Sequence, residues 1–249
     1  MSDPKPRVVA IVQARMGSTR LPGKVMLPLA GRPMIHHVVE RVGRVPEIDE
    51  VIVATSTLER ERPLVEYLEG IGIPVFRGSE QDVLERYYLA ARAYGADVVV
   101  RVTADCPLLS PRVSSEVVRT FLACEDCDYV SNTLERTFPR GLDTEVVGFP
   151  ALELAFREAR EPGEREHVTP YIWKRPERFR IRQLRGAVDL SSLRWTVDTR
   201  EDFELARRIF DALHRENPYF DVEEVQELLE RHPDWSKINA EVRQKGMDE

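Results

Sequence analysis

A short segment near the start of the chain has the composition of a phosphate-binding loop. It runs from Gln13 to Lys24, reads QARMGSTRLPGK, and combines two glycines, two hydroxyl side chains and three cations. Glycine lets backbone N–H groups approach anionic oxygens closely, hydroxyls add donors, and Arg or Lys neutralises negative charge. The alternative is a surface turn with solvated cations, but three cations in one turn repel one another when no anion is bound. We therefore predict that this loop binds a polyphosphate.

The loop does not match two common nucleotide-binding motifs. A Walker loop has four residues between its first glycine and the Gly-Lys pair, whereas five separate Gly17 from Gly23 here. Val25 also stands where that motif has a magnesium-binding Ser or Thr. No G-x-G-x-x-G sequence occurs in the chain, so a dinucleotide fingerprint is excluded as well.

Two aspartates follow apolar runs and are candidate metal ligands. Asp105 comes after the run 98–102, and Asp198 comes after the run 195–197. Ligands of α/β proteins gather at the carboxyl ends of strands, and Mg²⁺ prefers carboxylate oxygens together with substrate phosphates. We therefore predict that Asp105 and Asp198 hold Mg²⁺ opposite the loop. For Asp198 the alternative is a helix-start carboxylate favoured by the helix dipole.

The first half of the chain alternates strand and helix signals. Continuous apolar runs at 8–12 and 51–54 are typical of strands that are covered on both faces, and 97–102 is a third β-like run. Helical patterns follow them, with start signals at Pro33, at Ser56 with Glu59, at Ser79 with Asp82, and at Ser110 with Pro111. This alternation predicts an α/β fold with a mostly parallel central sheet and helices on both faces.

The second half is less regular. Residues 128–193 contain short β-like pieces at 145–147 and 179–184, and we expect an inserted subdomain there. The run 195–197 predicts a late return to the main sheet, followed by a helix capped by Thr199 and Asp202. One more helix, at about 222–229, belongs to a helical C-terminal extension over about 214–249, and the tail after Trp235 is expected to fray or pack on a neighbour. We expect the whole chain, 1–249, to be one domain.

Composition excludes several classes of protein. With 42% hydrophobic residues in a chain of 249, a sizeable core can form, so disorder is excluded as the main state. The balance of 36 Lys and Arg against 43 Asp and Glu gives a net charge of −7, which provides no overall attraction to nucleic acid. No apolar run could span a membrane and the charged start lacks a secretory core, so we expect a cytoplasmic protein without a membrane partner.

The three cysteines, Cys106, Cys124 and Cys127, are too few for a disulfide framework. The C-E-D-C spacing of Cys124 and Cys127 is compatible with a redox pair or half of a zinc site, but no second ligand pair accompanies it. We expect two packed thiols.

Several sequence blocks together resemble the cytidylyltransferases that make CMP-activated acidic sugars, the 3-deoxy-manno-octulosonate and acylneuraminate enzymes, and most closely the spore coat polysaccharide biosynthesis protein F family. The blocks are QARMGSTRLPGK (13–24), RGSEQDVLERY (77–87), RVTADCPL (101–108), YVSNTLERTFPRGLDTEV (129–146), EREHVTPYIW (164–173) and LRWTVDTREDFELA (193–206). The resemblance covers about residues 8–213. It implies a glycosyltransferase-A-like nucleotidyltransferase fold, and Mg²⁺-dependent transfer of CMP from CTP to a sugar, acidic sugar or sugar or polyol phosphate, with release of pyrophosphate, for surface polysaccharide synthesis.

The resemblance also implies roles for single residues. Lys24 and Arg15 would stabilise the leaving pyrophosphate, and Asp105 and Asp198 would hold the metal, so that these four are the catalytic residues. Metal binding would lower the pKa of the acceptor oxygen, so we name no side-chain base. Nucleotide-binding residues would be Gln13, Ala14, Gly17, Ser18, Thr19, Arg20, Arg77, Gly78, Ser79 and Thr103.

Acceptor-binding candidates cluster in the irregular region and mix both charges. They are Asn132, Arg140, Asp143, Glu145, Arg165, Glu166, His167 and Arg194. Arginine binds two oxygens of a carboxylate or phosphate at once, so an anionic acceptor is expected. Residues 164–166 have the alternative of a solvated helix start, and His167 that of a packed or capping histidine. Tyr87, Tyr88, Trp173 and Trp195 are expected to be packing residues.

Two alternatives remain beside the cytidylyltransferase. One is a guanylyltransferase or another nucleotidyltransferase of related fold, and the other is a protein that binds nucleotide without turnover. The family resemblance also implies a homodimer with contacts in 128–193.

Overall fold

The structure, a computed structural model, describes residues 5–244 and 246. Its centre is a sheet with the strand order β5-β4-β1-β6-β8-β7-β9. The strands are β1 (Val8–Gln13), β4 (Glu50–Ser56), β5 (Val75–Gly78), β6 (Val98–Thr103), β7 (Tyr129–Ser131), β8 (Glu145–Gly148) and β9 (Ile181–Gln183). Only β8 runs against its neighbours β6 and β7, and the other pairs are parallel. The expected mostly parallel sheet is confirmed.

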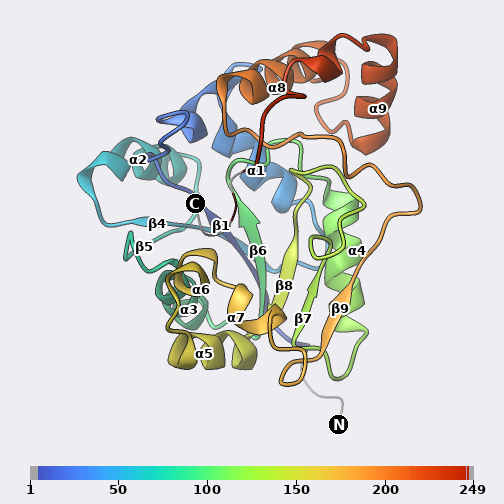
Figure 1. Cartoon of the computed structure of the whole chain (residues 1–249). Coiled ribbons are helices and arrows are strands. Elements are labelled where there is room, and N and C mark those ends of the chain that lie inside the picture. Colours follow the sequence, from blue (N-terminus) through green and yellow to red (C-terminus); the bar gives the residue numbers. More distant parts are fainter. Residues whose placement is uncertain (1–4, 245, 247–249) are drawn as a thin grey trace.

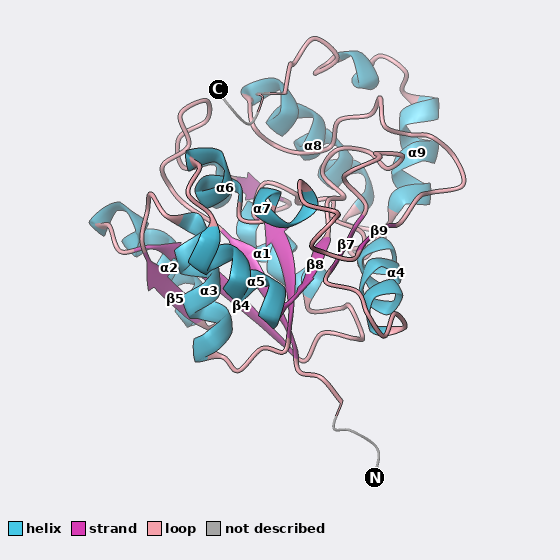
Figure 2. Ribbon diagram, turned by 60° about the horizontal axis from the view of Figure 1, so that its bottom comes forward, coloured by secondary structure: helices cyan, strands magenta, loops and turns pink. Residues whose placement is uncertain are grey.

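Helices cover both faces of this sheet (Figures 1 and 2). One face carries α1 (Met34–Val42), α2 (Arg62–Gly70) and α4 (Pro111–Leu122). The other carries α3 (Val83–Ala93), α5 (Phe149–Glu158), α6 (Pro162–His167) and α7 (Pro170–Trp173). Successive residues of a strand point to opposite faces, so Val8, Ala10 and Val12 enter the first core while Val9 and Ile11 enter the second. This two-sided burial explains the continuous apolar run in β1.

A third cluster joins the C-terminal helices α8 (Arg200–Leu213) and α9 (Val222–Arg231) to the body of the molecule. These helices lie beyond the end of the sheet toward which β6 points (Figure 1). The remaining elements are short: β2 (Pro28–Leu29) and β3 (Arg32–Pro33), and the 3₁₀ helices η1 (Lys24–Met26), η2 (Glu59–Glu61) and η3 (Trp235–Lys237). Residue Asn239, after η3, is buried against Arg194 and Asp202, so the described part of the tail packs on its own chain.

The expected strand at 195–197 is wrong. Trp195 and Val197 are buried, but they pack in the third cluster and belong to no strand of the central sheet. Their backbone runs beside two loops instead: Trp195 N–H donates to Arg140 O at 2.7 Å, and Val197 N–H donates to Asp105 O at 2.8 Å. Gly141 permits this approach, because a Cβ there would lie 2.5 Å from the backbone N of Thr196. Burial against helices produces the same apolar run as burial in a sheet.

The stretch 128–193, expected as an inserted subdomain, supplies strands β7, β8 and β9 of the central sheet. Its α5, α6 and α7 cover one face of that sheet. The sheet therefore continues through this stretch without interruption. It lies beside β6, which brings five of the eight expected acceptor residues to the same cavity as the loop after β1.

Some of the expected helix starts differ in detail. The cap of α4 by Ser110 and the capping box of Thr199 and Asp202 on α8 are confirmed. Helix α3 is capped by Asp82, whereas Ser79 accepts a hydrogen bond from the N–H of Asp82. The capping box expected at Ser56 and Glu59 is wrong, because α2 begins only at Arg62 and Ser56 hydrogen-bonds to Glu61.

The expectation of two free thiols at Cys124 and Cys127 is also wrong, because the structure joins them in a disulfide. Their Cα atoms lie 5.5 Å apart in the turn between α4 and β7, within the range that a disulfide bridges. The third cysteine, Cys106, is free and buried.

Candidate functional site

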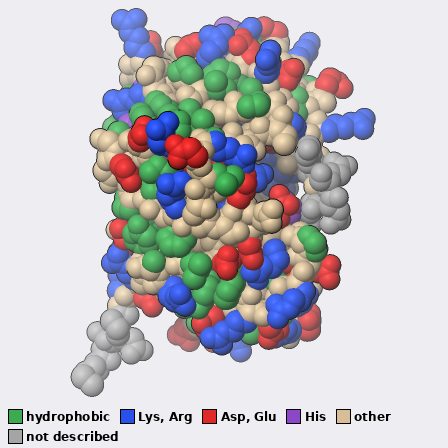
Figure 3. All heavy atoms as spheres, turned by 90° about the vertical axis from the view of Figure 1, so that its left-hand side faces the viewer, with side chains coloured by type: hydrophobic (Ala, Val, Ile, Leu, Met, Phe, Trp, Pro, Cys, Tyr) green, Lys and Arg blue, Asp and Glu red, His purple; other side chains and the backbone are tan. Residues whose placement is uncertain are grey.

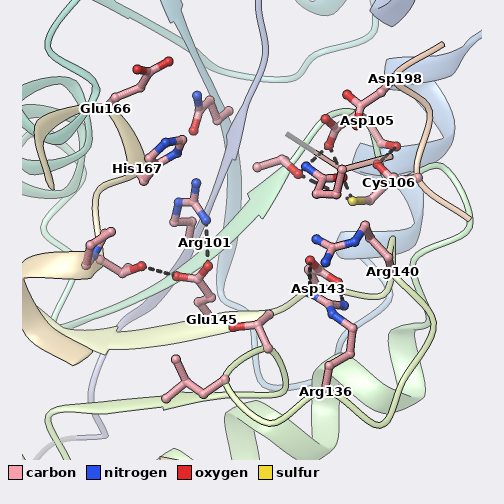
Figure 4. Close-up of a pocket in the computed structure, with 18 of the residues that line it drawn as sticks. Arg101, Asp105, Cys106, Arg136, Arg140, Asp143, Glu145, Glu166, His167 and Asp198 are labelled. Atoms are coloured by element: carbon pink, nitrogen blue, oxygen red, sulfur yellow. Dashed lines mark hydrogen bonds and ion pairs between the residues drawn. The ribbon is translucent and has the colours of Figure 1, made fainter. Parts of the chain in front are cut away.

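A cavity of about 600 Å³ opens at the carboxyl ends of β1 and β6 (Figure 4). Gln13 and Arg15 reach it from the end of β1 and the loop that follows, and Thr103 and Asp105 reach it from β6. Residues 133–145 and 166–173 form the opposite wall, and Asp198 closes the side toward α8. This is the position at which the sequence predicts the ligand.

Lys24, Asp105 and Asp198 form the charged centre of the site. The Lys24 Nζ lies 3.0 Å from Asp105 Oδ2 and 2.8 Å from Asp198 Oδ1, and it donates to Val197 O at 2.8 Å. Lys24 and Asp198 are each only 9% exposed. The two aspartates that lie 93 positions apart thus share one cation, as the prediction that they converge requires.

Each of these three side chains is fixed by local structure. Lys24 begins η1 directly after Gly23, whose φ of 69° is in the left-handed region that glycine adopts without strain. Asp105 accepts a 2.5 Å hydrogen bond from Thr103 Oγ1, in a turn that leaves β6. Asp198 precedes the capping box of α8, and its N–H donates to Asp202 Oδ2 at 3.0 Å.

Mutual ionic contact keeps the centre charged despite its burial. Burial lowers the pKa of Lys24, but the carboxylates of Asp105 and Asp198 outweigh this effect and the pKa is raised. Burial raises the pKa of Asp105, but Lys24 and the Thr103 hydrogen bond outweigh it and the pKa is lowered. Burial and the adjacent Asp105 raise the pKa of the Cys106 thiol well above its usual range, so Cys106 stays protonated.

The donor chemistry of this centre fits a divalent metal. Asp105 and Asp198 offer carboxylate oxygens, which Mg²⁺ prefers, and both lie close enough to share the Lys24 ammonium. Among the described residues no group of three or more metal-ligating side chains occurs. A metal ion here would therefore need further oxygens from a substrate, as expected for a site that binds a nucleotide phosphate together with its ion.

The predicted phosphate loop contributes cations to this centre. Arg20 pairs with Asp198 at 2.9 Å, and Arg15 lines the cavity. Gln13 also lines it, and its Oε1 is a buried acceptor without a hydrogen-bond partner in the described structure. Ala14 is buried beneath the loop, while Gly17, Ser18 and Thr19 lie in the loop away from the cavity wall.

The segment of Arg77, Gly78 and Ser79 ends β5 and does not line the cavity. Arg77 donates to the carbonyls of Ser56 and Leu58, each at 3.2 Å. Arg86 Nη1 donates to Ser79 O. Nucleotide binding by this segment therefore stays a prediction.

Part of the expected acceptor set lines the far half of the cavity. Arg140, Asp143, Glu145, Glu166 and His167 all lie there (Figure 4). Glu145 pairs with Arg101 at 2.7 Å and accepts a hydrogen bond from Thr169 Oγ1 at 2.6 Å. Arg136 forms two parallel bonds to Asp143, of 2.5 and 2.8 Å.

Three of the expected acceptor residues do not line the cavity. Asn132 is buried and bridges two backbone groups, Leu142 O and Thr144 N–H. Arg165 binds Asp82 and Phe156 O, and so ties α6 to α3 and α5. Arg194 pairs with Asp198 and Asp202 and therefore supports Asp198, the candidate metal ligand.

Sequence reasoning missed Arg101 and Arg136 as lining residues. Arg101 carries a signal that could have been used, because a charged residue inside the apolar strand β6 needs a buried partner. Arg136 carries no comparable signal, since its segment is irregular and mixed in charge. Trp173 packs against the second hydrophobic cluster, as expected, and its partly exposed side chain also lines the cavity.

The surface supplies two further observations. No helix within the described residues is both long and apolar enough to cross a bilayer. On the face shown in Figure 3, basic and acidic side chains are interspersed rather than gathered by sign.

Comparisons with known proteins show the family of this chain. The family model described as cytidylyltransferase matches residues 9–241. The spore coat polysaccharide biosynthesis protein SpsF of Bacillus subtilis is 33% identical over 235 residues, which are 91% of this chain and 95% of that protein. The solved structure of a cytidylyltransferase from Leptospira borgpetersenii is 31% identical, has a TM-score of 0.89, and covers 97% of this chain and 100% of its own.

A more distant solved structure shows the fold. CMP:2-keto-3-deoxy-manno-octonic acid synthetase complexed with CTP has a TM-score of 0.65 at 19% identity, with 82% of this chain and 98% of that chain covered. The expected nucleotidyltransferase fold is therefore confirmed.

Proposed function

Because this chain belongs to the cytidylyltransferase family, we propose that it transfers CMP from CTP to an anionic sugar or polyol-type acceptor and releases pyrophosphate. Membership of this family makes the chain a nucleotidyltransferase. The identity of its nucleotide, the class of its acceptor and the roles of its residues are what we propose. The observation that carries the proposal is the convergence of Asp105 and Asp198 on Lys24, beside the cationic loop and at the edge of the cavity.

The loop cations would provide most of the electrostatic stabilisation of the transition state. Negative charge grows on the pyrophosphate as it leaves, so cations that bind it more tightly in the transition state accelerate the reaction. Arg15, Arg20 and Lys24 lie in the loop that reaches this centre. Arg20 and Lys24 would exchange part of their contact with the aspartates for contact with phosphate oxygens.

We propose that a divalent ion, Mg²⁺, serves this site, held by Asp105 and Asp198. When bound, it would neutralise phosphate charge and lower the pKa of the acceptor oxygen. Thr103 keeps Asp105 oriented, and Asp202 with Arg194 keeps Asp198 oriented, so both ligands are positioned before substrate arrives.

The acceptor would occupy the far half of the cavity. Arg101 and Arg136 are already paired with carboxylates, whereas the Arg140 side chain has no ion pair among the described residues. Burial and the nearby Arg136 lower the pKa of Arg140, and the carboxylates of Asp143 and Asp198 offset this only in part. A carboxylate or phosphate of the acceptor would supply the missing partner.

A pyrophosphate-release assay tests the proposal. The protein is incubated with CTP, Mg²⁺ and a panel of acidic sugars and sugar or polyol phosphates, with GTP, UTP and TTP in parallel. We expect release with CTP and at least one acceptor. Release only with another nucleotide would identify a different nucleotidyltransferase, and CTP binding without release across the panel would favour a nucleotide-binding protein.

We also propose a cytoplasmic location, where CTP is available, and a homodimer with contacts in 128–193. The support for the dimer is the family resemblance alone. Light scattering at high protein concentration tests it, and a monomer would contradict it.

A further inference from the structure

Glu61, in η2, is a fully buried carboxylate outside the cavity. It is 0% exposed, and its Oε2 accepts the N–H of Met16 at 2.8 Å. Thr55 Oγ1 donates to Oε2 and Ser56 Oγ donates to Oε1, each at 3.2 Å. The single side chain thus connects the phosphate loop to the end of β4.

Such a group is costly to bury, because a carboxylate taken from water must recover its hydration from the protein. The only ion pair to Glu61 among the described residues comes from its neighbour Arg60, at 3.5 Å. The other contacts are one backbone N–H and two hydroxyls. Removing the carboxylate would leave the N–H of Met16 without this acceptor, and the loop would lose its fixed position.

Arg60 holds the same loop from its outer side. A Cβ at Gly17 would lie 2.8 Å from Arg60 Nη2, so the guanidinium packs directly against the loop backbone. Arg60 also forms an ion pair with Glu80, in the segment before α3. The two adjacent residues of η2 therefore clasp Met16 and Gly17, between the cations Arg15 and Arg20.

We propose that Glu61 is the positioning residue of the triphosphate loop, and that it sets the affinity for nucleoside triphosphate without contacting it. The inference rests on the proposed function, because the loop needs a fixed shape only if it grips a ligand. A preformed loop binds more tightly, since no ordering cost is incurred on binding. Loss of Glu61 should thus weaken CTP binding and raise KM for CTP, while kcat changes little.

The test compares four proteins by calorimetric CTP binding with Mg²⁺, by steady-state kinetics and by thermal unfolding. Glu61→Ala removes all acceptors, and Thr55→Val removes one bond to Glu61 at nearly constant shape. Glu61→Gln keeps one acceptor for Met16 and a donor for a hydroxyl. The control is Glu59→Ala in the same 3₁₀ helix, whose side chain is 81% exposed and pairs with Arg62.

We expect CTP affinity to fall by about tenfold or more in Glu61→Ala and by about threefold in Thr55→Val, in line with the loss of buried hydrogen bonds. Glu61→Gln should recover most of the affinity, and Glu59→Ala should equal the wild type. In each variant kcat should stay within about threefold of the wild-type value, because the loop can still close on bound ligand. If Glu61→Ala does not fold, the CTP affinities of Thr55→Val and Glu61→Gln still test the role of Glu61.

A second readout observes the loop directly and does not depend on activity. The chain has only five methionines, so selective ¹⁵N-methionine labelling gives a simple spectrum in which Met16 is assigned by Met16→Leu. We expect the Met16 amide proton to exchange slowly in the wild type and in Glu61→Gln, and fast in Glu61→Ala.

Unchanged CTP affinity in a folded Glu61→Ala would overturn the role of Glu61, and where that variant does not fold, unchanged affinity in Thr55→Val would overturn it. So would slow Met16 exchange in Glu61→Ala. A wild-type protein that binds no CTP would instead overturn the proposed function, and this inference with it. The two failures are therefore distinguishable.

Discussion

At the scale of single residues, the site is a balance between buried carboxylates and cations. Asp198 contacts Arg20, Lys24 and Arg194, and Asp105 shares Lys24. A buried ion pair is costly to break, because the remaining partner keeps its charge without compensation. Substitutions here should therefore change both stability and catalysis.

Lys24→Ala tests this balance. The change leaves Asp105 and Asp198 facing each other without their shared cation, and should cost ~3–5 kcal/mol of unfolding free energy. Pyrophosphate release should fall by orders of magnitude. Mg²⁺ should raise the melting temperature of the variant more than that of the wild type, because the released carboxylates can hold the ion.

These quantities are measured by thermal unfolding with and without MgCl₂ and by the pyrophosphate assay. Lys237→Ala, at an exposed position in η3, is the matched control. Near-normal release in Lys24→Ala would remove Lys24 from the mechanism. A melting temperature of Lys24→Ala equal to that of the wild type would contradict the stabilising role of Lys24 between the two carboxylates.

Arg140→Gln tests the acceptor half of the cavity. The substitution removes an arginine without an ion pair among the described residues, so KM for the acceptor should rise by about tenfold or more, as for a lost charge-assisted hydrogen bond. KM for CTP should change by less than about twofold, because the nucleotide contacts are elsewhere. Steady-state kinetics with each substrate varied in turn measure both. An unchanged acceptor KM would show that Arg140 does not bind the acceptor.

The sequence allows prediction of some site residues but not others. Asp105 follows β6 and the loop 13–24 follows β1, and these two strands are parallel neighbours, so the meeting of the loop with Asp105 could be predicted. Asn132 and Arg165 come from the stretch 128–193, where the sequence pattern is irregular and composition does not tell a ligand-facing side chain from one that binds the backbone. Glu61 is hidden among the charged residues 59–62, and only the tertiary structure shows that it is buried.

At the scale of elements, burial on both faces made β1, β4 and β6 easy to predict. Strand β7 contains three residues, too few for any periodicity, and the sequence does not predict it, whereas β8 and β9 coincide with the β-like pieces predicted at 145–147 and 179–184. The disulfide of Cys124 and Cys127 depends on the turn between α4 and β7, whose geometry a count of cysteines does not contain.

The packing of α1 against α8 gives a prediction about pH. His37, in α1, is 2% exposed, lies against Phe210 of α8, and donates from Nε2 to Leu29 O at 2.7 Å. Burial lowers its pKa from 6.5 to about 4, although the Leu29 carbonyl opposes this shift. The unfolded chain therefore takes up this proton at a higher pH than the folded chain.

This difference sets the direction in which the free energy of unfolding changes with pH. The contribution of His37 to stability is complete above about pH 6.5 and is lost progressively as the pH falls toward about 4, by at most about 3 kcal/mol. Urea unfolding at pH 7 and pH 4.5 measures it. His37→Gln should lose this part of the pH dependence, whereas His232→Gln should keep it. Equal pH dependence in all three proteins would contradict the assignment.

At the scale of the whole molecule, the site joins parts that are far apart in the sequence. The loop after β1 meets the turn after β6 and the residues before α8, and Gln244 near the C-terminus lines the same cavity. Gln244 also hydrogen-bonds Arg194 at 2.8 Å, next to Asp198. The fold thus brings the proposed nucleotide and acceptor halves of the cavity together around one charged centre.

The most direct test of the central claim is a crystal structure with CTP and Mg²⁺ bound. We predict that oxygens of the triphosphate lie within hydrogen-bond distance of Arg15, Arg20 or Lys24, and that the metal ion is bound by both Asp105 and Asp198. A nucleotide bound elsewhere, or an ion that contacts neither aspartate, would contradict the account.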